Sequence, residues 1–211
     1  MSFSIKLLDS VGAIEKKVNA ALSLQVNSLL VRNKQKTLTD IRSFVEKCVV
    51  EQPEIISLRA GGQGSLAAQF GIHVGQESSV VDSIISAIVD ATKVNVGRFN
   101  LNLEGKIHIS FQPSDFTNLL ALPTGYVSTE LGVKLDWLKW LLTEGQRVIV
   151  VGYEYVASPN GRSRGGVMRA GKAWRVPTEF SGTIEDNFIT RAFSGRENEL
   201  QNLMAKFLGS N

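Results

Sequence analysis

The fold is decided by residues 93–111, KVNVGRFNLNLEGKIHISF, where the pattern of the chain changes. Apolar and polar side chains alternate one by one on either side of Glu104-Gly105, as they do along a strand with one buried face. The Glu-Gly pair is typical of a turn. These residues therefore predict a β-hairpin that begins a sheet.

The residues before this hairpin have the spacing of amphipathic helices. We predict a long helix over about residues 10–33 and a second helix over about 39–51, which ends before Pro53. A glycine-rich loop at 60–64 precedes a short helix at 66–70. The apolar face of a further helix consists of Val81, Ile84, Ile85, Ile88 and Val89. The apolar face of the long first helix needs a partner surface, because apolar side chains favour burial.

The residues after the hairpin predict a mixture of helices and strands. We expect a helical piece over 114–122, a helix over 134–144 capped by Gly145, and a strand over 147–155. Thr183 and Asp186 resemble a capping box that opens a helix to about residue 192, and a last amphipathic helix follows from Ser194.

The predicted class is α+β: amphipathic N-terminal helices packed on a small, mostly antiparallel sheet, with a long basic loop and C-terminal helices. We expect a single domain over 1–211, helical over 1–92, with the sheet, the loop and the closing helices over 93–211.

The predicted helix over 134–144 is apolar around most of its circumference. Only one narrow stripe is polar, so either the chain's own fold or a neighbouring subunit must cover the rest. Large aromatic side chains dominate many protein interfaces, although they are equally common in cores. The candidate interface anchors are Trp137, Trp140, Trp174 and Phe180.

Residues 156–178 contain four glycines, Pro159 and no acidic residue, which predicts a long loop or an extended hairpin. Positive charge accumulates here, and three interpretations stay open: a solvated loop, an arm that docks on acidic surfaces of adjacent subunits, or a contact with the DNA backbone. The cations concerned are Arg162, Arg164, Arg169, Lys172 and Arg175.

The sequence predicts no catalytic, metal or cofactor site. Residues 166–173 have phosphate-loop spacing, but Ala173 stands where that motif requires Ser or Thr. His73, His108 and Cys48 lack the spacing of zinc ligands, and neither histidine has a partner motif for nucleophilic catalysis. Cys48 is expected to be a buried, inert thiol. We therefore predict a protein that is not an enzyme and needs no cofactor.

Composition is that of a folded globular protein, with 43% hydrophobic and 20% charged residues and a net charge of +3. No apolar run approaches the roughly 20 residues of a membrane-spanning helix. Lys6 lies within the first residues, where a signal peptide would need an apolar region, so folding in a cytoplasm is expected.

Four stretches of the chain resemble head-to-tail joining proteins of tailed bacteriophages, the neck and tail-completion group. They are GVKLDWLKWLLTEG at 132–145, GRSRGGVM at 161–168, WRVPTEFSGT at 174–183 and NFITRA at 187–192. Matching family positions are occupied by Pro177, Phe180, Phe188, Ile189, Arg191 and Ala192. The commoner family form gathers such residues into one compact segment, whereas here they are spread over 177–192.

The resemblance implies a structural subunit of the virion that forms a ring of identical copies around the DNA channel. Its implied partners are the portal connector and tail proteins, with non-specific DNA contact in the channel and no membrane. The implied location is the virion neck, after assembly in the host cytoplasm. The alternative is a nucleic-acid-binding module that uses the basic loop at 156–178.

Overall fold

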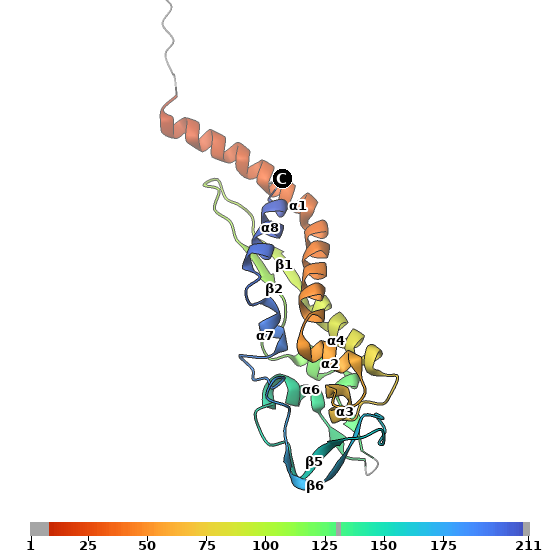
Figure 1. Cartoon of the computed structure of the whole chain (residues 1–211). Helices are drawn as coiled ribbons and strands as arrows, with labels where there is room; N and C mark the ends of the chain where they lie inside the picture. The colour runs from red at the N-terminus through yellow and green to blue at the C-terminus, as the bar shows by residue number, and fades with distance from the viewer. Residues whose placement is uncertain (1–8, 130–131, 209–211) are drawn as a thin grey trace, which may run out of the picture. The chain divides into compact units, whose positions relative to one another are not determined.

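The computed structural model describes residues 9–129 and 132–208 and confirms the α+β class. Helices combine with three antiparallel sheets of two strands each (Figure 1). The predictions made for residues 1–8 lie outside the described residues. No helix in the described ranges has the length and apolarity that crossing a membrane requires.

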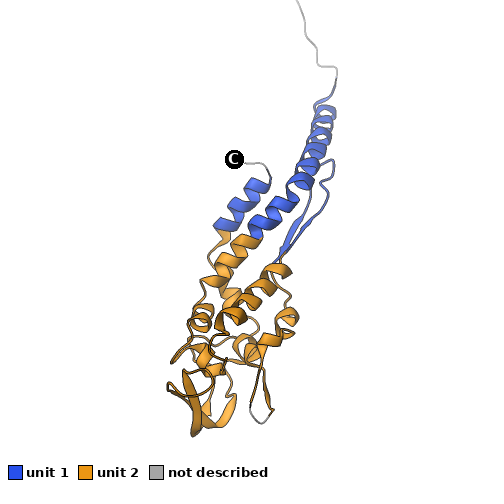
Figure 2. Ribbon diagram, turned by 90° about the vertical axis from the view of Figure 1, so that its right-hand side faces the viewer, with its two compact units in different colours: residues 1–41, 93–110, 198–211 blue, residues 42–92, 111–197 orange. Residues whose placement is uncertain are grey.

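Contacts divide the chain into two compact units (Figure 2). Unit 1 comprises residues 1–41, 93–110 and 198–211, and unit 2 comprises residues 42–92 and 111–197. The chain passes from unit 2 to unit 1 after residue 92, the residue at which the sequence predicted the helical part of a single domain to end.

Helix α1 runs without interruption from Val11 to Val50, where the sequence predicted two helices. Residues 34–38 contain neither glycine nor proline, so nothing there breaks the backbone hydrogen bonding. The end of α1 agrees with the prediction, because α2 (Pro53–Ala60) starts with the proline in its first turn. There the missing amide proton of proline costs nothing.

In unit 1, β1 (Lys93–Val96) pairs antiparallel with β2 (Ile107–Ser110), which confirms the predicted hairpin. The connection is longer than predicted and spans residues 97–106. Its backbone is held by Asn27 of α1, whose side chain donates to the Phe99 carbonyl at 3.0 Å and accepts from the Phe99 amide at 2.9 Å. Backbone bonds from Gly97 to the Lys106 carbonyl and from Asn100 to the Glu104 carbonyl remain, so the Asn27 bonds supplement the pairing within the connection.

The predicted last helix is α8 (Glu197–Phe207), and most of its residues also belong to unit 1. Phe207 is buried, and Asn33 of α1 donates to the Phe207 carbonyl at 3.4 Å.

The alternation of leucines in the 97–106 connection did not signal a strand, since Leu101 is exposed and Leu103 has a φ of 62°.

The helical core of unit 2 is built by α2, α3 (Leu66–Phe70) and α4 (Glu77–Ala91), followed by α5 (Thr117–Leu120) and the short helix η1 (Pro123–Gly125). The predicted apolar face of α4 is correct except for its last residue. Val81, Ile84, Ile85 and Ile88 are buried together with Val80, while Val89 is half-buried.

The apolar helix predicted over 134–144 is shorter and is covered by the chain's own fold. Lys134–Leu135 form strand β4, which pairs with β3 (Val127–Ser128). The helical part consists of α6 (Trp137–Lys139) and η2 (Trp140–Glu144), a π-helical turn. The leucines that required cover, Leu138, Leu141 and Leu142, are buried.

Gly145 follows η2 as its C-terminal cap, as predicted, and its φ of −61° is right-handed. A side chain at this position would meet the backbone nitrogen of Gly182 at 2.8 Å. At Gly182, a side chain would in turn meet the Leu141 carbonyl oxygen. The two glycines therefore allow the end of η2 and residues 181–182 to pack backbone against backbone.

The basic stretch forms an extended hairpin, one of the two predicted alternatives. Strand β5 (Val150–Ala157) pairs antiparallel with β6 (Gly166–Trp174), with an irregularity at Gly152, whose φ is 80°. Residues 166–173 thus lie in a strand, which offers no helix N-terminus to a phosphate group.

Helix α7 (Phe188–Phe193) begins at a different cap from the predicted one. The Asn187 side chain accepts from the amides of Ile189 and Thr190, and Thr190 Oγ1 accepts from the Asn187 amide at 2.9 Å. Thr183 and Asp186 instead close the preceding turn, since the Thr183 amide donates to the Asp186 carbonyl at 2.7 Å. Asn187 is the better cap here because its side chain accepts from two amides of the first turn of α7, those of Ile189 and Thr190.

An ion pair joins α7 to α2 inside unit 2. Arg191 donates to Glu54 at 2.6 Å and to Asp186 at 2.9 Å, and the Glu54 side chain is almost fully buried. Burial lowers the pKa of Arg191, but the hydrogen bonds and charges of Glu54 and then Asp186 outweigh it and raise the pKa above its ordinary value.

Candidate interaction site

Unit 2 contains a mostly apolar cavity of about 410 Å³ beside the β5–β6 hairpin. Cavities of roughly 300–1,000 Å³ are large enough to hold a ligand or a side-chain cluster. Its wall comes from four separated segments of the chain. Its principal lining residues are Phe70, Gly71, Leu135, Trp140, Tyr153, Tyr155, Arg162, Met168 and Trp174.

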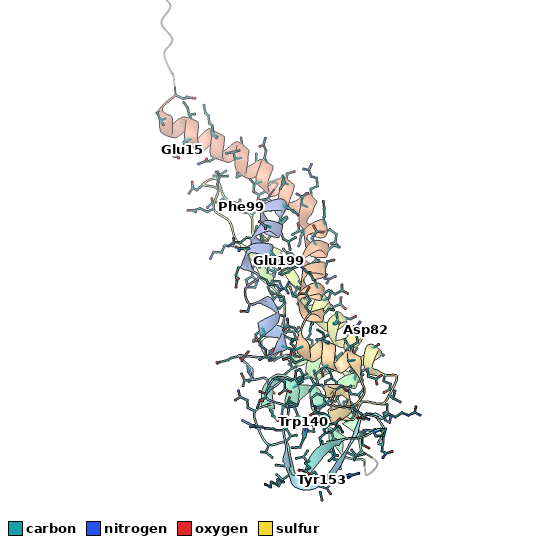
Figure 3. The ribbon with its side chains drawn as sticks, in the orientation of Figure 1. Glu15, Asp82, Phe99, Trp140, Tyr153 and Glu199 are labelled. Carbon is teal, nitrogen blue, oxygen red and sulfur yellow. The ribbon has the colours of Figure 1, made fainter. Side chains whose placement is uncertain are left out.

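An aromatic cluster forms the wall of this cavity. The ring of Phe70 stacks on Trp137 at 5.1 Å between centroids and meets Trp174 edge-on at 6.0 Å. Trp140 approaches Trp174 at 6.1 Å, and the Trp174 indole donates to Gln69 at 3.4 Å. Figure 3 labels Trp140 and Tyr153 near the β5–β6 hairpin. These contacts make the wall rigid, because each ring is held by another.

The hairpin itself is fixed by Tyr155. Its hydroxyl donates to the Gly165 carbonyl at 2.7 Å and accepts from the Gly64 amide at 2.9 Å. Gly166 lies directly against the Tyr155 ring, where any side chain would collide with it. The predicted glycine-rich loop around residue 62 and the predicted basic stretch are thereby brought together.

Arg162 is the cation that lines the cavity. Its guanidinium donates to the Ser128 carbonyl at 2.6 Å and lies over Gly71, where a side chain would collide with the guanidinium at 2.7 Å. Gly71 has a φ of 70° and so adopts a conformation that favours glycine. No aspartate or glutamate is among the described residues that line the cavity.

The other four predicted cations are all exposed. Arg164 follows Arg162 in the hairpin loop, Arg169 and Lys172 lie on β6, and Arg175 follows β6. The structure therefore separates Arg162, which is half-buried at the cavity, from the rest of the basic set.

The four predicted anchors differ in their accessibility. Trp137 is 0% exposed and Trp174 is 6% exposed, so both belong to the core of unit 2. Trp137 has no surface with which to anchor a partner, because helices and rings of its own unit cover it completely. Trp140 and Phe180 are half-buried and keep surface available, and Trp140 lines the cavity.

The sequence did not single out Tyr153, Tyr155 and Met168, although all three line the cavity. The two tyrosines are two residues apart in a predicted strand, so their placement on one face was open to prediction. That these tyrosines line the same cavity as Phe70 and Trp140 depends on packing between residues far apart in the sequence.

In unit 1, the predicted apolar face of α1 remains uncovered over its first turns. Val11 is 80% exposed, and Val18 and Leu22 are also exposed. Leu24 and Val31 lie on the same helix and are more than 70% exposed. Among the described residues, no element covers this part of the face. That a partner surface covers it therefore stays a prediction.

His73 and His108 are exposed, and Cys48 is buried as expected. Among the residues that the structure describes, no group of three or more His, Cys, Asp or Glu side chains is arranged to hold a metal ion.

Comparisons with protein-family models, with curated proteins and with solved structures find no match to this chain.

Proposed function

We propose that the chain is a structural subunit, without enzymatic activity, that forms a ring with copies of itself in the neck of a tailed bacteriophage. There it would join the portal connector to the tail. The observation that carries the self-assembly is the presence of two apolar surfaces on one chain: the cavity beside β5–β6 and the uncovered face of α1. Contiguous apolar surface on a water-exposed protein is typical of interaction sites.

The assignment to the neck rests on the resemblance of residues 132–192 to head-to-tail joining proteins. A ring fits a chain with such surfaces, because a closed ring needs an interface in which one patch meets a different patch on the next copy. The exposed cations of the hairpin support a position close to DNA or to acidic neighbouring subunits.

We expect the purified protein to form closed rings, alone or on an isolated phage connector. Light scattering after size-exclusion chromatography gives the mass, and two-dimensional class averages from electron microscopy give the symmetry. The proposal is wrong if only monomers are found even with connector and tail proteins present.

A second candidate function is nucleic-acid binding, which the exposure of Arg164, Arg169, Lys172 and Arg175 favours. Four phosphate contacts would lower the affinity for duplex DNA about 100-fold between about 50 and 200 mM salt, because each contact releases counterions. Fluorescence anisotropy with labelled DNA measures this slope. Replacing Arg169 and Lys172 by alanine should make the slope shallower, and a flat salt dependence of the wild type would exclude this function.

A further inference from the structure

We propose that the cavity beside β5–β6 receives the turn carrying Ile184 and Glu185 from a second copy of this chain. The inference rests on the proposed self-assembly and names the two surfaces that meet. Two conditions must hold. The cavity must be able to bind an apolar side chain and an adjacent carboxylate, and the turn must expose both of these groups.

The cavity suits such a pair because its surface is mostly apolar and Arg162 is the one cation among its described lining residues. A guanidinium has five hydrogen-bond donors. Arg162 directs one donation to Ser128, and no carboxylate of the described lining residues neutralises its charge. A carboxylate arriving with an apolar side chain would bond the remaining donors while the side chain fills the aromatic wall.

The turn at 183–186 offers this combination. Ile184 is 61% exposed, and the adjacent Glu185 is exposed and has no ion pair among the described residues. Exposure of a large branched aliphatic side chain at the tip of a turn is unfavourable in water. A partner that buries it would remove this cost.

The turn is also rigid before any partner arrives. The buried Asn187 side chain donates to the carbonyls of Thr183 at 2.9 Å and Ile184 at 3.4 Å. The Asp186 amide donates to Thr183 Oγ1 at 3.1 Å. A segment that is already ordered loses little conformational entropy on binding, so its contacts contribute more fully to affinity.

Ile56 and Leu101, two of the other exposed apolar residues in the described ranges, fit less well. Ile56 lies close in sequence to Glu54, but this carboxylate is buried and paired with Arg191. Leu101 lies close to Glu104, whose carboxylate accepts from Asn100 at 3.1 Å. Neither presents a free carboxylate beside its apolar side chain.

Each copy carries both the cavity and the turn, and the two consist of different residues. The contact is therefore heterologous: the cavity of one copy holds the turn of the next, whose own cavity holds the turn of a third. Repetition of such a contact closes into a ring when the rotation between copies divides the circle.

The test uses two variants of the full chain that break opposite halves of the contact. Arg162→Glu places like charges together and leaves the turn intact, whereas Ile184→Asp removes the inserted side chain and leaves the cavity intact. We expect each variant alone to raise the apparent dissociation constant of assembly about 100-fold, because like charge and unpaired polar groups at an interface are costly. Sedimentation velocity over a concentration series measures this.

The mixture of the two variants gives the sharper result. The intact cavity of the Ile184→Asp chain can take the intact turn of the Arg162→Glu chain, but the reverse contact is broken on both sides. We therefore expect a one-to-one heterodimer and no ring. The double variant Arg162→Glu with Glu185→Arg restores an opposite-charge pair and should recover assembly.

Arg147→Glu is the matched control, since it reverses an exposed charge of unit 2 outside both the cavity and the basic set and should leave assembly unchanged. Circular dichroism checks the fold of every variant. If Arg162→Glu unfolds, Glu185→Arg tests the same pair from an exposed position. Rings that persist in Glu185→Arg and Ile184→Asp would overturn this contact and leave the proposed assembly standing. A wild type that stays monomeric under all conditions would contradict the proposed function itself.

Discussion

Trp137→Ala should lower the free energy of unfolding of the isolated subunit by about 3–5 kcal/mol, as for other large aromatic residues removed from cores. The side chain is 0% exposed and stacks on Phe70, and its indole donates to the Thr124 carbonyl at 3.0 Å. Alanine would leave a cavity and an unpaired carbonyl. Urea denaturation followed by circular dichroism, at concentrations where the protein is monomeric, measures the loss.

The matched control is Val151→Ala, because Val151 is 79% exposed on the same unit. We expect this change to stay within about 0.5 kcal/mol of the wild type. An interface anchor would behave in the opposite way, with unchanged monomer stability and weaker assembly. Stability of Trp137→Ala within about 0.5 kcal/mol of the wild type would therefore contradict its assignment to the core.

Arg191→Met should lower the free energy of unfolding by about 3 kcal/mol, because it leaves the buried Glu54 carboxylate without a counter-charge. This lies at the lower end of the range for such losses, since the Arg191 side chain is itself one-third exposed. Urea denaturation again provides the measurement.

Two variants separate the cost of an orphaned charge from the loss of a contact. Glu54→Leu combined with Arg191→Met should recover most of the stability, because no buried charge remains. Asp186→Asn should cost less than about 1 kcal/mol, since Asp186 is exposed. A double variant as unstable as Arg191→Met alone would contradict this account.

The raised pKa of Arg191 fixes the sign of any pH effect from this residue. A group whose pKa is higher in the folded state contributes its full stabilisation below its ordinary pKa and loses it only as pH rises through the raised value. The contribution of the Arg191 charge should therefore be constant between about pH 6 and pH 9.

Local signals in the sequence were sufficient for many elements. The short helix at 66–70 and the apolar face of α4 follow from periodicity and flanking glycines, and both have the predicted positions. The helix boundary before Pro53 follows from the chemistry of proline. In each case the residues that decide the structure lie within a few positions of it.

Errors arose where side-chain hydrogen bonds decided the local structure. The connection at 97–106 looks like two strand ends, but Asn27 bonds its backbone from 72 positions away. The cap of α7 was assigned to a Thr-Asp pair, although Asn187 satisfies two amides and closes the turn as well. Competing polar groups of equal local quality cannot be ranked without the tertiary contacts.

The candidate site was predicted in part. The cations of the basic stretch and the tryptophans were recognised from the sequence, but among these residues only Arg162, Trp140 and Trp174 line the cavity. Burial of Trp137 depends on Phe70 and the helices around it, which no periodicity near residue 137 reveals. Only the tertiary packing therefore shows which of the predicted cations and tryptophans are accessible to a partner.

The threading of the chain through its two units has a consequence for synthesis on the ribosome. Unit 2 consists of two sequence stretches separated by residues 93–110. Unit 1 consists of three separate stretches, the last of which begins at residue 198. Translation runs from the N-terminus, and domains generally fold as units during it. The part of α1 around Asn33, which donates to the Phe207 carbonyl, must therefore wait for residues after 197 to emerge and is a natural target for chaperones during that interval.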